Sequence, residues 1–183
     1  MTAAPSFGSR PQPLSLQPAL PGLLLAVLTL LFGFGMGVVF GLNEDLIKSR
    51  LSAAAAAAPA SVYQQDEGAK RAVLDKSWTY MQRAHLHAGS LGAVSVALTL
   101  VLVGLGTGAR ATRAVSIGLG GGSLGYSVFW LWAGFRAPGL GSTGAAKESL
   151  AWLAIPSSGL VVAGTFAVAA LIALAILRRP NTA

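Results

Sequence analysis

Four stretches of the chain, at about 19–42, 84–108, 114–135 and 150–177, contain no Asp, Glu, Lys or Arg and are rich in Leu, Val, Ala and Gly. As helices, each is long enough to cross the roughly 30 Å hydrocarbon core of a bilayer. The sequence therefore predicts an all-α fold, a bundle of four transmembrane helices. The first stretch exceeds the apolar part of a cleavable signal peptide, so we expect it to be retained.

The outer parts of the chain differ from this apolar region. Residues 1–18 contain four prolines and a single charge, on Arg10, so they are too polar to form a packed core. We expect a flexible tail over 1–18, one membrane domain over 19–179 and a second tail over 180–183.

The connection between the first two spans is long and predicted to be partly helical. Asn43 is a good helix cap, and the two acidic residues that follow it suit the positive end of a helix dipole. A helix over about 44–58 follows, either lying in the membrane interface or serving as a spacer. The next helix is expected to begin near Lys70 and to enter the membrane around Arg83.

Composition agrees with a membrane protein. Only 10% of the residues are charged and 54% are hydrophobic, whereas soluble domains have about a quarter charged residues. The net charge of +7 points to anionic lipid headgroups, and no nucleic-acid partner is expected from so apolar a chain. The absence of cysteine excludes disulfides, thiolate metal sites and cysteine nucleophiles.

Four crossings bring alternate connections to opposite membrane faces. One face collects most side chains able to carry chemistry: Asn43, Glu44, Asp45, Trp78, Tyr80, Arg83, His85, His87, Trp130, Trp132, Arg136, Lys147, Glu148 and Trp152. The other face has mainly arginines, on a short connection and the C-terminal tail, where no acidic residue accompanies them. We therefore expect an integral protein of a bacterial-type inner membrane, with both termini on the cytoplasmic side.

The only two histidines, His85 and His87, lie near the start of the second span. They point about 200° apart on a helix and cannot chelate one metal together. His85 shares its face with Gly89 and Gly92, which leave room for a flat macrocycle, so His85 is a candidate haem ligand. The simpler interpretation is a histidine that bonds a carbonyl or contacts headgroups. For His87 three roles are open: a second haem ligand, a proton carrier or a packing residue.

Glycine recurs every four residues on two of the predicted helices, a spacing that lets helix backbones approach closely in lipid. The rows are Gly33, Gly37 and Gly41 on the first helix, and Gly118 with Gly122 and Gly121 with Gly125 on the third. Four helices bury only some of these faces and have limited room for a whole haem. We therefore expect a homo-oligomer, in which contacts between copies bury the remaining glycine faces and provide space for the haem.

The stretch Arg83-Ala84-His85, preceded by aromatic residues and followed by a glycine-containing span, resembles the styrene oxide isomerase family. The chain length, the four spans and the aromatic end of the third span, followed by a Pro- and Gly-rich loop, resemble it too. The resemblance implies a homo-oligomer, a trimer in that family, with haem b at subunit interfaces and His85 as its axial ligand. Ferric iron would then act as a Lewis acid that opens small apolar epoxides to aldehydes.

In such a reaction Tyr80, Arg83 and His87 are the polar side chains expected to assist. Leu91 and Trp130 stand where the family has an asparagine and a tyrosine, so the resemblance supports haem binding more than isomerase activity. The alternative function is a non-catalytic accessory or electron-carrying subunit whose glycine faces dock onto a larger membrane complex.

Overall fold

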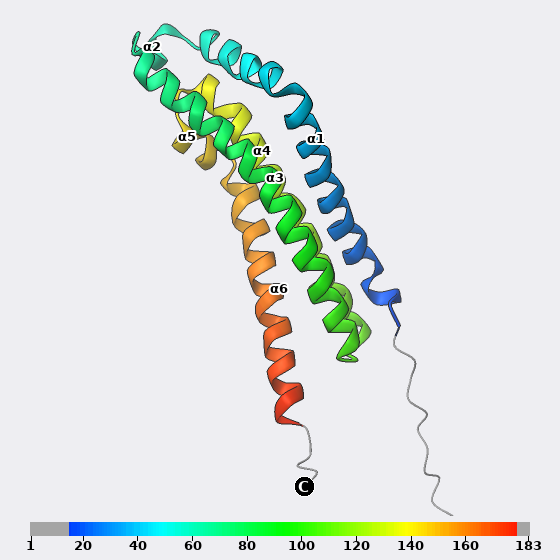
Figure 1. The fold of residues 1–183 in the computed structure, drawn as a ribbon. Helices are drawn as coiled ribbons and strands as arrows, with labels where there is room; N and C mark the ends of the chain where they lie inside the picture. The colour runs from blue at the N-terminus through cyan, green and yellow to red at the C-terminus, as the bar shows by residue number, and fades with distance from the viewer. Residues whose placement is uncertain (1–14, 179–183) are drawn as a thin grey trace, which may run out of the picture.

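The computed structural model describes residues 15–178, which are almost entirely helical and contain no strand (Figure 1). The long helices are α1 (Leu20–Ala56), α3 (Glu67–Gly104), α4 (Ala109–Leu140) and α6 (Ala151–Leu177). The short helix η1 (Gln17–Ala19) directly precedes α1, and α2 (Ala60–Tyr63) and α5 (Thr143–Glu148) lie in the connections. The all-α prediction is confirmed. The tails predicted over 1–18 and 180–183 lie, apart from residues 15–18, outside the described residues.

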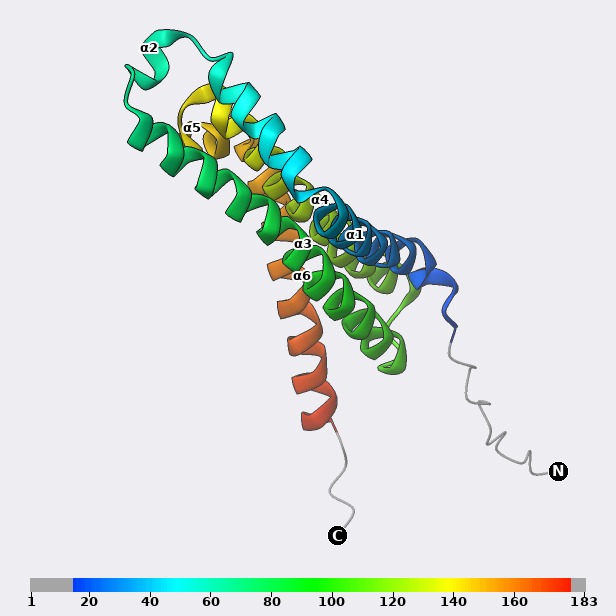
Figure 2. The ribbon, with the colours of Figure 1, turned by 45° about the horizontal axis from the view of Figure 1, so that its top comes forward.

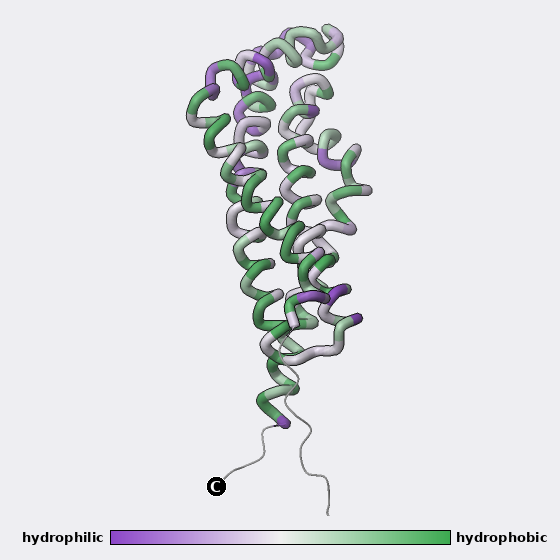
Figure 3. Tube along the Cα trace, turned by 90° about the vertical axis from the view of Figure 1, so that its right-hand side faces the viewer, coloured by the Kyte–Doolittle hydropathy of each residue, from purple (hydrophilic) through white to green (hydrophobic). Residues whose placement is uncertain are grey.

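Each of the four long helices is long and apolar enough to cross a membrane, as predicted. Their apolar stretches lie between polar segments at the two ends of the molecule (Figure 3). The chain is therefore an integral membrane protein. Helix η1 and the end of α6 lie at the same end of the bundle (Figure 2). That this end faces the cytoplasm stays a prediction.

Helices α1, α3 and α4 pack against one another, and α6 packs chiefly against α4 (Figure 1). Small residues permit these close approaches. A Cβ atom built on Gly122 would lie 2.7 Å from the Ser157 carbonyl oxygen of α6. On the other side of α4, a Cβ on Gly120 would overlap the Gly22 carbonyl of α1. Glycine on α4 thus brings both neighbouring helices into backbone contact.

The predicted helix after Asn43 exists, but it is continuous with the first span. Helix α1 runs on to Ala56 and is interrupted only at Asn43, whose backbone angles (φ −135°, ψ 29°) are not helical. Beyond this kink, Ile47 and Leu51 are buried together with Met81 of α3. The second half of α1 is therefore packed along α3 and is not a free spacer. A position in the membrane interface stays a prediction.

Helix α3 begins slightly earlier than predicted, at Glu67 instead of near Lys70. The Asp66 side chain accepts a hydrogen bond from the Ala69 N–H (2.9 Å) and caps the helix. Ahead of it, α2 is tied to the far end of α4, because the Tyr63 hydroxyl donates to the Pro138 carbonyl (2.5 Å). The connection between the first two spans is therefore anchored.

Candidate functional site

Helix α3 carries every predicted site residue, and its rotation decides which neighbour each one meets. One side of the helix is buried through Ala84, Ala88 and Gly92. His85 lies at the edge of this side that faces α1, and His87 lies at the edge that faces α4. Both imidazoles are partly exposed. The two histidines therefore belong to different helix interfaces, in keeping with the predicted divergence of their side chains.

The His85 ring is fixed by a backbone acceptor on α1. Its Nδ1 atom lies 2.8 Å from the Gly33 carbonyl oxygen. A carbonyl can only accept a hydrogen bond, so Nδ1 is the donor. The neutral imidazole then keeps its lone pair on Nε2. A histidine that binds a metal typically has this arrangement, with one nitrogen held by a carbonyl and the other free to coordinate.

Glycine at position 37 makes room for the His85 imidazole. A Cβ atom on Gly37 would lie 2.9 Å from the ring atom Cε1, closer than real Cβ contacts come. The Phe40 ring contacts the imidazole from the same helix, edge to face, with centroids 6.3 Å apart. The α1 glycine row thus supplies both the hydrogen-bond acceptor and the space that the His85 ring occupies.

The two glycines expected to leave space beside His85 have different surroundings. A Cβ on Gly89 would meet no atom within 4 Å, so this position borders open space. A Cβ on Gly92 would lie 2.9 Å from the Leu30 side chain, because α1 fills the space predicted there. Gly89 remains a candidate contact for a flat cofactor, whereas Gly92 serves the packing of α1 on α3.

The three predicted catalytic side chains gather at the interface of α3 with α4. The Arg83 guanidinium lies 5.1 Å from the Trp130 ring centroid and 5.7 Å from that of Tyr80. The Tyr80 ring packs edge-on against Trp130, with centroids 4.8 Å apart. The His87 ring lies 6.2 Å from Trp130. These side chains share Trp130 as their common neighbour, while His85 contacts α1.

The sequence analysis did not identify two groups that contact the histidines. Tyr126 contacts the His87 ring at 5.2 Å between centroids. Its position one helical turn before Trp130 was a usable signal, since residues four apart share a helix face. The Gly33 carbonyl that holds His85 had no signal, because no side chain marks a backbone acceptor.

The Trp130 indole N–H is a polar atom without a partner. Its Nε1 is buried and forms no hydrogen bond with any described residue. A buried donor of this kind is usually paired with water or a ligand. The contact between α3 and α4 around Trp130 is therefore a second place, besides His85, where a polar group lies in the membrane region.

Residues 15–178 contain no group of three or more His, Asp or Glu side chains arranged to hold a metal ion. A bare ion needs several protein ligands, whereas a haem iron receives four nitrogens from its own macrocycle and needs one or two from the protein. The donor set here is a single oriented imidazole, the number of protein ligands that one axial position of haem b requires. The open space at Gly89 lies one helical turn further along α3.

Most glycine rows are used within the chain. Gly37 accommodates His85, and Gly33 brings α1 against Gly89, whose backbone N would be 3.0 Å from a Cβ on Gly33. Gly122 faces α6 of the same chain. These faces are therefore not free for another protein, although a Cβ on Gly41 would still meet nothing within 4 Å.

Comparison of the chain with models of protein families, with curated proteins and with solved structures finds no match.

Proposed function

We propose that this integral membrane protein binds haem b, with His85 Nε2 as an axial ligand. The observation that carries the proposal is the 2.8 Å contact between His85 Nδ1 and the Gly33 carbonyl. It orients the ring and leaves one nitrogen free for iron. The partial exposure of His85 and the open space at Gly89 support a cofactor that lies against the α1–α3 surface.

A homo-oligomer is part of this proposal. One chain offers a single face to the macrocycle, and a large apolar cofactor on an outer surface needs a cover. A second copy of the chain is the cover we propose, with His85 and Gly89 near the contact. The glycines of α4 do not contribute to this contact, because α1 and α6 already occupy them.

Epoxide isomerisation by the bound haem is a second proposal, separate from haem binding. If haem b is bound at His85, its ferric iron would supply a Lewis acid for an epoxide oxygen. Arg83, Tyr80 and His87 contact Trp130 on α4, while His85 contacts α1. The geometry therefore supports haem binding better than catalysis by this set. The accessory-subunit alternative has less support, because the glycine faces meant for docking are largely buried.

The test is the absorption spectrum of the purified chain after haem supplementation, for the wild type and for His85→Ala and His87→Ala. We expect a Soret band for the wild type, its loss in His85→Ala and its retention in His87→Ala. His87→Ala is the matched control, since it removes the same group two residues away. Circular dichroism checks that both variants keep their helices.

Retention of haem by His85→Ala, or loss of haem by both variants alike, would contradict the proposed ligand. Native mass measurement of the haem-loaded particle tests the homo-oligomer, and a single chain carrying haem would contradict it. Aldehyde formation from an aryl epoxide, followed on the loaded protein, tests the isomerase proposal independently.

A further inference from the structure

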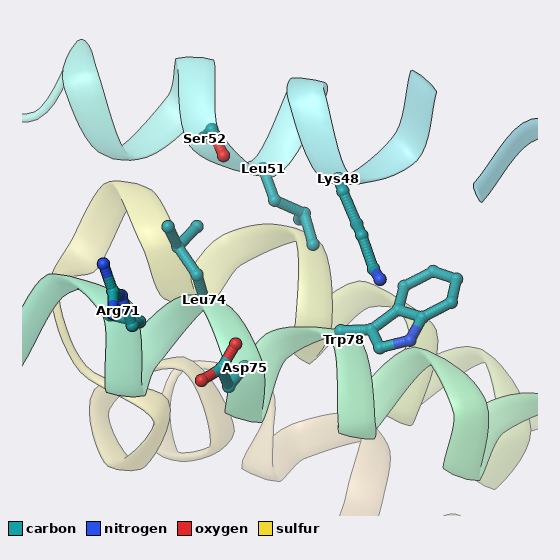
Figure 4. Close-up of a pocket in the computed structure, with 7 residues that line it drawn as sticks. All are labelled: Lys48, Leu51, Ser52, Arg71, Leu74, Asp75 and Trp78. Atoms are coloured by element: carbon teal, nitrogen blue, oxygen red, sulfur yellow. The ribbon is translucent and has the colours of Figure 1, made fainter. Parts of the chain in front are cut away.

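An open cavity of about 300 Å³, lined by charged and apolar side chains, lies between the second half of α1 and the start of α3, apart from both histidines (Figure 4). Lys48 and Ser52 reach it from α1, and Arg71, Asp75 and Trp78 reach it from α3. Two leucines, one from each helix, complete its wall. Haem binding and epoxide chemistry assign no role to this cavity.

The charged groups at the cavity have both signs. Lys48 Nζ lies 2.5 Å from a carboxylate oxygen of Glu44 and 5.4 Å from the Trp78 ring centroid. Arg71 and Asp75 are one helical turn apart on α3, yet neither forms an ion pair with another residue in the range 15–178. The lining thus holds two positive side chains and one negative side chain. Because Lys48 is already paired with Glu44, Arg71 and Asp75 are the two charges available to a ligand.

This arrangement matches a zwitterionic group better than a simple anion. A phosphate can accept from the Arg71 guanidinium, whose planar set of donors suits phosphate oxygens. A primary ammonium one helical turn away can donate to the Asp75 carboxylate. A purely anionic group would meet repulsion from Asp75. A choline group has no N–H to donate, and Lys48 covers the Trp78 face that would attract it.

On α1, the cavity lies close to the end of the charge-free stretch, where lipid headgroups are expected. The charge-free part of α1 ends at Leu42, immediately before the Asn43 kink, and Lys48 follows about one and a half turns later. Trp78 is a residue type enriched at membrane–water interfaces. Leu51 and Leu74 offer apolar contact beside the charged groups.

We propose that this cavity binds the headgroup of a phosphatidylethanolamine-type lipid, with the phosphate at Arg71 and the ammonium at Asp75. The bound lipid would join the second half of α1 to α3. The site is independent of haem binding, so its test does not depend on the outcome at His85.

The experiment uses native mass spectrometry of the full chain in detergent with phosphatidylethanolamine, phosphatidylglycerol or phosphatidylcholine of identical acyl chains. Soluble phosphoethanolamine is the fourth probe. The variants are Arg71→Gln and Asp75→Asn, with Lys76→Gln as the control, since Lys76 is an exposed cation on α3 that does not line the cavity.

We expect the ethanolamine lipid to be retained about tenfold more than the other two, as one or two charged hydrogen bonds allow. Arg71→Gln should lower this retention by a similar factor. Asp75→Asn should remove the preference for ethanolamine over choline, and Lys76→Gln should change neither. Equal retention of the three lipids, or equal effects of Arg71→Gln and Lys76→Gln, would overturn the site. Tight binding of soluble phosphoethanolamine would overturn its assignment to a lipid.

Discussion

Replacing Gly37 by alanine tests whether the His85 imidazole is held as described. The new Cβ would lie 2.9 Å from the ring atom Cε1. The ring must then move, and its hydrogen bond to the Gly33 carbonyl lengthens or breaks. That bond contributes about 1 kcal/mol to stability. Alanine in place of glycine inside a helix returns about 1 kcal/mol. The two effects nearly cancel, so thermal stability should change little.

Haem affinity should respond differently, because it depends on the orientation of the ring. Loss of the partner that orients a metal-binding histidine typically lowers metal affinity about 10- to 100-fold. The assay is a haem titration of the apo-protein in detergent, followed at the Soret band. We expect Gly37→Ala to weaken haem binding by that factor while its melting temperature stays close to that of the wild type.

Gly41→Ala is the matched control. It makes the same substitution one turn further along α1, where a Cβ would meet no atom within 4 Å. It should bind haem like the wild type. If Gly37→Ala and Gly41→Ala bind haem equally well, the contact between the imidazole and α1 does not hold the ligand, and the reasoning fails.

Two further predictions concern stability. Burial raises the pKa of the Tyr63 hydroxyl above its ordinary value near 10, so the neutral, bonded form is favoured in the folded chain. The contribution of the Tyr63 hydroxyl to stability should be complete below about pH 10 and be lost as the pH rises through its folded-state pKa. Tyr63→Phe should lower the free energy of unfolding by about 1 kcal/mol at neutral pH and remove this part of the pH dependence. Thermal unfolding of both proteins between about pH 8 and pH 11 measures this, and parallel curves would contradict it. Gly122→Ala should destabilise the chain by about 1–3 kcal/mol, because its Cβ would lie 2.7 Å from the Ser157 carbonyl oxygen, while Gly121→Ala meets only an ordinary 3.7 Å contact and should be tolerated. Equal melting temperatures for these two variants would refute the close approach of α4 and α6.

The four spans were predictable because each is a charge-free run of the right length. The start of α3 was predicted near Lys70, three residues after Glu67, where the helix begins behind its Asp66 cap. Element ends were less well defined. Helix α4 continues through Pro138, and the short helix α5 was not expected, because its six residues carry no periodic apolar signal.

The site was predictable only as far as helix geometry reaches. The spacing of His85 and His87 predicted opposite sides of α3, and they contact α1 and α4 respectively. What fills the space beside a given glycine depends on the rotation and height of the neighbouring helix. Leu30 therefore occupies the space at Gly92, while the space at Gly89 stays open, although the two glycines looked equivalent along α3.

The hydrogen bond from Tyr63 to Pro138 has a consequence for the order in which the protein assembles. The two residues are 75 positions apart in the chain. During synthesis Tyr63 emerges before α3 and α4, and its acceptor is made only after the third span. The connection that carries α2 therefore stays open while these helices insert. Closing it is a late step, which fixes this end of the molecule once the third span has crossed the bilayer.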